Sequence, residues 1–361
     1  CRTRAVNYGQ GRWPKACFKV CLATIGPEVS MRWLAAVFLM ACSEVAVDAF
    51  AEARLIAALP TEAALDVSFP NGGGAEKPGN RLTGSGFVNT SVIVAHSLNV
   101  SIRSLLAPLR KALTAASTET PYGRVWRHED SDGKTLLVAE EGVDGHVEYT
   151  VSTQRKGGAW APLISGTATR GLDGTQGAIW IDLRQDASPK TTGRFLVLYS
   201  DAPGQRYLTL YSYGTTAVDD DTAEADAGSR VFHFEGSRDE GSLVFARDAL
   251  AVHYGPGQPL VVSGNLVTRW NLEGGRTDIV AWGGDLAAAG FEAGRGSECW
   301  DRPGLKTTYG VAYRTPIGEP EAYYGDTGTE SLCRFSDFLE PALPQPPDAP
   351  PDPILPAEAT D

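Results

Sequence analysis

The sequence has few of the residues and motifs on which most enzyme chemistry depends. Of its 361 residues only five are histidine and six are cysteine. It contains no Gly-x-Ser-x-Gly turn for a nucleophilic serine, no His-Glu-x-x-His pair for zinc and no phosphate-binding loop with Gly-Lys-Ser/Thr. It also has no dinucleotide-binding glycine pattern after a predicted strand. We therefore predict a protein that is not an enzyme, with no catalytic residue and no cofactor.

Metal-binding patterns are scarce as well. The five histidines lie far apart in the sequence, at His96, His128, His146, His233 and His253. One acidic run could offer oxygen ligands to Ca²⁺, so Asp219, Asp220 and Asp221 remain a calcium candidate. The alternative is a solvated loop between two strands, because the run lacks the spaced ligands and the glycine of a calcium loop.

Positive charge is low. The chain carries 32 basic and 44 acidic side chains, a net charge of −12 at pH 7. From Cys42 onward 26 basic residues face 43 acidic ones, a net charge of −17. Nucleic acids and anionic lipid headgroups bind basic surfaces, so this composition argues against nucleic acid as a partner.

The apolar run of residues 33–41 is much shorter than the ~20 residues that a membrane-spanning helix needs. It follows Met31 and Arg32, which is the layout of a signal peptide. Its end, Leu-Met-Ala before Cys42, resembles the bacterial lipobox. We predict a signal peptide at 31–41, a lipid on Cys42 and attachment to the membrane of the bacterial cell envelope, most often the outer membrane. The alternative is a buried N-terminal helix with Cys42 as a core thiol.

Residues 1–30 show neither apolar periodicity nor a domain pattern. We interpret them as a stretch that lies upstream of the true start of the protein, which we place at Met31. Cys17 and Cys21 have no second Cys or His cluster nearby, so a leader is favoured over a zinc site.

Three cysteines remain from Cys42 onward. With Cys42 committed to lipid, Cys299 and Cys333 form an even pair in an oxidising compartment, and we predict a disulfide between them. Two unpaired core thiols are the alternative.

One long helix is predicted at 87–116. Leu98, Ile102, Leu105, Leu109 and other apolar residues recur there at steps of three and four. Pro108 removes a backbone donor and predicts a kink or a break. A shorter tether helix is predicted within 42–62, before a single β domain at 63–338.

From residue 122 onward the pattern changes to short β-type runs between turn dipeptides such as Asp132-Gly133. The predicted strands are Thr135–Glu141, His146–Arg155, Trp160–Arg170, Gly177–Leu183, Arg194–Tyr199, Arg206–Tyr213, Arg230–Glu235, Ser242–Arg247, Leu260–Asn271 and Thr277–Trp282. The fold class is mainly β (α+β), a large curved antiparallel sheet or half-barrel with the long helix packed on it. The sequence does not decide between an open half-barrel and a closed barrel. Residues 339–361 are predicted as a Pro-rich acidic tail, disordered or polyproline.

Aromatic and leucine side chains are the remaining candidates for a binding site. Inside a curved sheet they could line an apolar cavity for a lipid or another hydrophobic ligand. The candidate lining residues are Leu98, Ile102, Leu105, Leu109, Trp160, Trp180 and Trp270. Packed against the helix, the same residues would simply form the core.

Several motifs resemble one group of proteins. They are Ser297-Glu298-Cys299-Trp300-Asp301 with a second cysteine further on, Thr268-Arg269-Trp270, Gly274-Gly275, Leu59-Pro60-Thr61 and Ser165-Gly166-Thr167. Together they are similar to uncharacterised predicted lipoproteins of myxobacteria and their relatives. This resemblance implies a location and no activity. Two functions remain: a non-enzymatic envelope lipoprotein with a structural or interaction role, for which another envelope protein is the candidate partner, and a carrier of a hydrophobic molecule.

Overall fold

The computed structural model describes residues 50–70, 86–142, 144–171, 174–185, 191–204, 206–219, 222–224, 230–252, 260–302, 305, 307–348 and 355–359. The chain divides into two compact units, residues 1–54 and 55–361. The sheet, the helices that cover it and the C-terminal segment all belong to the second unit. The predicted signal peptide, the leader, Cys42, Asp220 and Asp221 lie outside the described residues.

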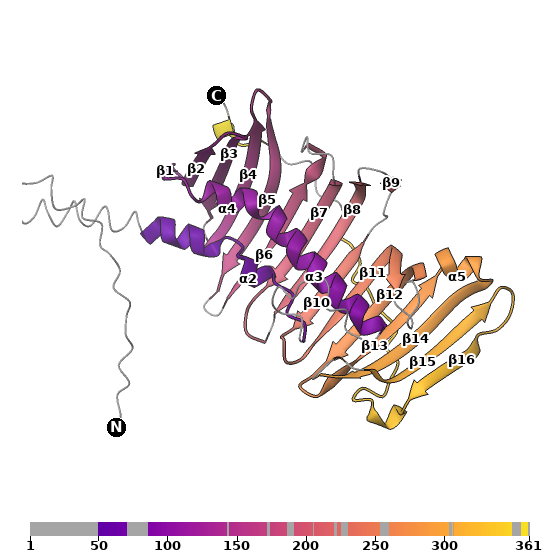
Figure 1. Cartoon of the computed structure of the whole chain (residues 1–361). Coiled ribbons are helices and arrows are strands. Elements are labelled where there is room, and N and C mark those ends of the chain that lie inside the picture. Colours follow the sequence, from indigo (N-terminus) through magenta and orange to yellow (C-terminus); the bar gives the residue numbers. More distant parts are fainter. Residues whose placement is uncertain are drawn as a thin grey trace, which may run out of the picture. The chain divides into compact units, whose positions relative to one another are not determined.

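Sixteen strands among the described residues form one antiparallel sheet (Figure 1). Fifteen follow one another from β1 to β16, and β9 pairs only with β8. The ends, β1 and β16, do not pair with each other, so this sheet is open. The strands are β1 (Ser117–Glu119), β2 (Gly123–Glu129), β3 (Gly133–Glu141), β4 (His146–Arg155), β5 (Trp160–Arg170), β6 (Thr175–Asp182), β7 (Thr191–Ser200), β8 (Tyr207–Asp219), β9 (Thr222–Glu224), β10 (Val231–Gly236), β11 (Gly241–Val252), β12 (Leu260–Trp270), β13 (Gly274–Trp282), β14 (Phe291–Asp301), β15 (Thr307–Pro316) and β16 (Ala322–Gly328).

The mainly β fold is confirmed, and each of the ten strands predicted from residue 122 onward overlaps an observed one. Turn chemistry explains the agreement, as at the β2–β3 turn, where Asp130 accepts hydrogen bonds from the N–H groups of Asp132 and Gly133. Strands β1, β2, β9, β14, β15 and β16 were not predicted. Strand β14 contains Gly294 and Gly296, which have low strand propensity.

Among the described residues, the helices and 3₁₀ turns that accompany the sheet are α2 (Glu62–Leu65), α3 (Phe87–Leu105), α4 (Ala107–Ala112), α5 (Gly284–Ala288), η2 (Leu183–Gln185), η3 (Glu330–Leu332) and η4 (Ala357–Ala359). Residues 50–58 are helical as well. The predicted break is confirmed, because α3 ends at Leu105 and Pro108 lies in the first turn of α4. The helical region ends before the predicted residue 116.

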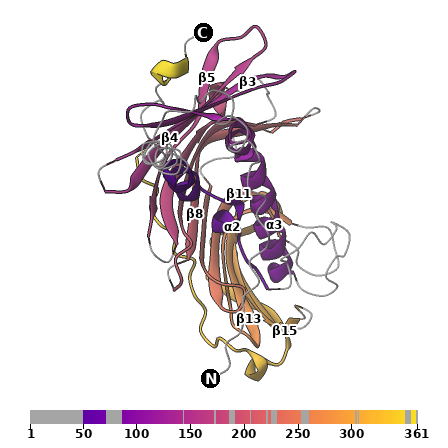
Figure 2. The same cartoon turned by 90° about the vertical axis from the view of Figure 1, so that its left-hand side faces the viewer.

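Helices α3 and α4 cross one face of the sheet, which we call the inner face. Helix α3 contacts β11 to β14, and α4 contacts β2 to β4. Figure 2 shows the sheet curving around these helices. The core lies between them, with Ile102, Leu106 and Leu109 of the helical region buried against sheet residues such as Leu137 and Trp270.

Four aromatic side chains of the inner core lie directly across from a glycine on the neighbouring strand. The pairs are Tyr149 with Gly166, Tyr199 with Gly177, Trp270 with Gly241 and Trp300 with Gly275. A Cβ at Gly275 would lie 2.1 Å from Cζ2 of Trp300. Glycine is therefore required at this position so that the indole can cover the backbone.

The other face, which we call the outer face, is crossed by the C-terminal segment. Leu343 packs on an outer cluster, Pro347 accepts a hydrogen bond from Tyr213, and Glu358 accepts one from Arg127. Figure 2 shows this yellow segment on the side of the sheet opposite α3. The described part of the predicted tail thus lies on the sheet through these contacts, and residues 357–359 within it form η4.

Candidate functional site

The structure separates the predicted ligand-lining residues between the two faces. On the inner face Ile102, Leu109 and Trp270 are buried in the core, with Leu98 and Leu105 packed against it. Trp160 and Trp180 instead pack on two outer clusters. These two tryptophans were wrongly assigned to a common cavity, because strand alternation places them on the face away from α3.

On the inner face, a small hollow lies between described residues of α3, the sheet and α5. Its volume is about 60 Å³, and it is lined by apolar residues including Phe87, Val262, Ile279 and Leu286. A larger hollow of about 440 Å³ lies beside Arg295, Glu321 and Phe338. Ligand sites for small molecules usually measure ~300–1,000 Å³, so the hollow beside α3 is too small for the predicted hydrophobic ligand.

Three of the five motifs, 268–270, 274–275 and 297–301, lie on the neighbouring strands β12, β13 and β14. Because side chains alternate between the faces of a strand, each motif serves both faces. The inner set is Thr268, Trp270, Thr277, Glu298 and Trp300. The outer set is Arg269, Arg276, Asp278, Ser297 and Cys299. We call these the inner lock and the outer lock.

The inner lock begins with Glu298, a buried carboxylate that caps α3. Its Oε2 accepts hydrogen bonds from the backbone N–H groups of Phe87 at 2.6 Å and Val88 at 3.2 Å, and its Oε1 from that of Gly86 at 3.1 Å. Thr307 donates a further hydrogen bond to Oε1. Carboxylates are favoured at helix N-termini because unpaired N–H groups and the helix dipole face them there. Glu298 thus fixes the start of α3 on the sheet.

A chain of hydroxyl groups continues the inner lock under the first turns of α3. Ser91 Oγ lies 2.6 Å from Thr268 Oγ1, which lies 3.1 Å from Thr277 Oγ1. The indole N–H of Trp300 donates to Thr277 at 3.3 Å. All four residues are buried. Polar groups that satisfy one another in this way fix the helix position specifically.

The outer lock is centred on Asp278, whose side chain is 0% exposed. Its Oδ1 accepts hydrogen bonds from Arg276 Nε at 2.7 Å and from Ser297 Oγ at 2.6 Å. Its Oδ2 accepts one from Arg269 Nη2 at 3.1 Å and one from the backbone N–H of Leu339 at 3.2 Å. All four partners are hydrogen-bond donors, so both oxygens of this buried carboxylate are satisfied.

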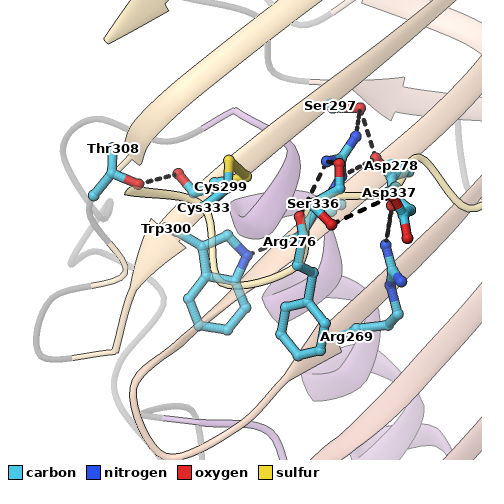
Figure 3. Close-up of a disulfide and its surroundings, with 12 residues drawn as sticks. Arg269, Arg276, Asp278, Ser297, Cys299, Trp300, Thr308, Cys333, Ser336 and Asp337 are labelled. Atoms are coloured by element: carbon cyan, nitrogen blue, oxygen red, sulfur yellow. Dashed lines mark hydrogen bonds and ion pairs between the residues drawn. A yellow bond between two sulfur atoms is a disulfide. The ribbon is translucent and has the colours of Figure 1, made fainter. Parts of the chain in front are cut away.

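The two arginines of the outer lock also hold the C-terminal segment by its backbone (Figure 3). Arg276 donates to the carbonyl oxygens of Phe335 and Ser336, and Arg269 to that of Asp337. The predicted disulfide lies next to these contacts and joins Cys299 to Cys333. The outer lock therefore holds the C-terminal segment at the point where it starts to cross the outer face of the sheet.

The sequence motifs supported a resemblance, but sequence reasoning did not identify Glu298, Arg276 or Asp278 as site residues. One sequence signal could have identified such residues. On β12 and β14 a charged residue lies close to a tryptophan, Arg269 beside Trp270 and Glu298 near Trp300. Charges are rarely buried unless they are paired.

The described residues contain no group of three or more His, Cys, Asp or Glu side chains that could hold a metal ion. Of the calcium candidate only Asp219 is described, at the end of β8. Elsewhere, burial raises the pKa of Tyr149 well above its ordinary value, and burial also lowers that of His233.

Helix length and composition alone would allow residues 87–112 to cross a membrane. In this structure the same residues form α3 and α4, and their contacts with the sheet assign them to the inner face.

The chain matches no protein-family model, no curated protein and no solved structure. Its resemblance to predicted myxobacterial lipoproteins therefore stays a prediction.

Proposed function

We propose that this chain is a lipid-anchored protein of the bacterial cell envelope with a non-enzymatic, structural or interaction role. The anchor rests on the sequence from Met31 to Cys42, which has the layout of a lipoprotein signal peptide. Several acyl chains together give the stable attachment that a single chain does not. A net charge of −17 from Cys42 onward suits a domain that stays in the aqueous phase beside the membrane.

The observation that supports an interaction role is the filled inner face. Leu106, Leu109 and Ala112 of the helical region are almost completely buried against the sheet. Glu298 and the hydroxyl chain fasten the opposite end of the helical region. Such a domain is rigid, and its exposed surfaces are what it can offer to partners.

The carrier hypothesis finds less support. It requires an apolar cavity of several hundred Å³ between helix and sheet, whereas the hollow beside Phe87 has about 60 Å³.

Intact-mass spectrometry of protein extracted from membranes tests the anchor. We expect a product that begins at a lipid-modified Cys42, and Cys42→Ser should release the protein into the soluble fraction. Ser43→Ala, at the neighbouring position, is the matched control and should leave the membrane fraction unchanged. A soluble wild-type product that begins before Cys42 would contradict the proposal.

A further inference from the structure

The outer face carries a row of apolar and aromatic side chains that runs across four strands. Trp180 of β6 pairs with Leu196 of β7, Leu196 with Tyr211 of β8, and Tyr211 with Val231 of β10. Tyr213 extends the row, with its ring centroid 6.1 Å from that of Trp180. We call these five residues the outer patch. Because the row lies across the strands, an extended segment on it must also cross them.

The segment that covers the outer patch has a regular proline spacing. Residues 341–347 are Pro-Ala-Leu-Pro-Gln-Pro-Pro, so that Pro341, Pro344 and Pro347 follow one another at steps of three. A polyproline II helix has three residues per turn, which brings these three prolines to one side of the segment. Pro341 is buried, Leu343 and Pro344 are partly buried, and Gln345 is exposed.

The contacts between this segment and the outer patch are those by which aromatic surfaces recognise polyproline helices. Leu343 packs on the cluster that contains Leu196, Tyr211 and Val231. The Tyr213 hydroxyl donates a 3.0 Å hydrogen bond to the carbonyl oxygen of Pro347. Carbonyl groups of a polyproline helix have no partner within the helix, so they accept such bonds freely.

Length agrees with this arrangement. At ~3.1 Å per residue, the four steps from Leu343 to Pro347 span ~12 Å. Three neighbouring strands at ~4.8 Å spacing cover ~10 Å. The segment is therefore long enough to reach from β6 to β8.

We propose that the outer patch is a binding surface for extended peptides with P-x-x-P spacing, and that residues 341–347 occupy it as an internal ligand. The partner class is a proline-rich segment of another envelope protein, which would replace the tail. This inference deepens the proposed interaction role and rests on it. Upstream, Arg269 and Arg276 hold residues 335–337 through backbone carbonyls, and Arg269 also stacks on the Phe335 ring, so displacement of residues 341–347 leaves the outer lock intact.

Fluorescence anisotropy with a labelled peptide of residues 339–348 tests the proposal on the full chain. An internal ligand competes at an effective concentration on the order of millimolar, so wild-type protein should bind the peptide weakly. The variant Leu343→Asp with Pro344→Gly weakens the internal tail, and we expect it to bind the peptide at least tenfold more tightly. Gln345→Ala, an exposed position in the same segment, is the matched control and should behave as wild type.

Further substitutions in the weakened-tail variant examine the surface itself. Trp180→Ala should abolish binding, and Tyr213→Phe, which removes only one hydroxyl, should weaken binding several-fold. Thermal melts identify any variant that fails to fold, in which case Tyr213→Phe provides the decisive comparison.

Equal binding by a scrambled peptide, or binding unaffected by Tyr213→Phe and Trp180→Ala, would overturn the inference. A stable wild-type dimer in size-exclusion chromatography would overturn internal occupancy, since the tail would then lie on a second copy. Lipidation of Cys42 is measured separately. Loss of peptide binding by lipidated protein therefore rejects this inference and leaves the proposed anchor in place.

Discussion

The two faces of the sheet are covered by different kinds of segment and held by different chemistry. On the inner face an α-helix is fixed through its N–H groups by the carboxylate of Glu298. On the outer face an extended tail is fixed through its carbonyl groups by Arg269 and Arg276. The helix also presents Ser91 to a specific hydroxyl partner, whereas in the tail Arg269 and Arg295 stack on the rings of Phe335 and Phe338. The inner cover is therefore fixed by a carboxylate and hydroxyl groups, and the outer cover by arginines that contact both its carbonyl groups and its aromatic rings.

The largest effect is expected from the outer lock. Arg276→Leu leaves the buried carboxylate of Asp278 without its closest charged partner, which should cost about 3–5 kcal/mol of unfolding free energy. Urea denaturation measures the loss. Arg269→Leu is the matched control and should cost less, because Arg269 is partly exposed. Equal losses of unfolding free energy in the two variants would contradict the larger role expected of the buried Arg276.

Opening the disulfide should have the next largest effect. Cys299→Ala with Cys333→Ala removes a crosslink between residues 34 apart, worth about 4 kcal/mol in the chain-entropy model. Denaturation under reducing conditions should reproduce the loss in wild type and change nothing further in the variant. Hydrogen exchange should rise at residues 334–339 and stay low in α3. A parallel rise in α3 would mean that the two faces are not independent.

Removal of the inner cap is expected to cost somewhat less. Glu298→Ala leaves the N–H groups of residues 86–88 without their acceptor, a loss of about 2–3 kcal/mol for hydrogen bonds to a charged group. Exchange of the first α3 amides reports the change. Glu298→Gln keeps one acceptor oxygen and should fall between wild type and Glu298→Ala. The comparison between the faces fails if the tail amides respond instead.

The smallest effect concerns His233, which hydrogen-bonds Thr209 on the outer face at 2.8 Å. Burial lowers its pKa below the ordinary value of 6.5, so the unfolded chain binds the proton more readily. Its contribution to stability is complete above pH 6.5 and is lost as the pH falls from 6.5 toward 5. Melting temperatures over this range should flatten in His233→Gln, while His96→Gln, at an exposed position of α3, should retain the wild-type slope.

Much of the fold can be predicted from patterns that the sequence displays openly. The turn dipeptides located ten strands, the leucine spacing located the long helix, and Pro108 located its break. The faces could not be assigned in the same way. Both faces of β3 are apolar, with Leu136 in an outer cluster and Leu137 in the inner core, because both are covered. Alternation alone could not reveal that Trp180 faces the tail.

The candidate site was less predictable for a related reason. Its residues lie on three strands, and β14 was not predicted at all. Glu298 meets Phe87 across 211 positions of sequence, and only the completed sheet brings them together. Gly166 and Gly275 looked like turn or motif residues, although each lies under an aromatic ring from the neighbouring strand.

That long separation also sets an order of events for a folding chain. The amides at the start of α3 emerge from synthesis about two hundred residues before the carboxylate that caps them. Contacts of such high sequence separation form late, because the closure entropy of the intervening chain must be overcome first. The N-terminus of α3 can therefore be capped only after β14 has been synthesised. A chain that stops before β14 lacks the acceptor that fixes this helix.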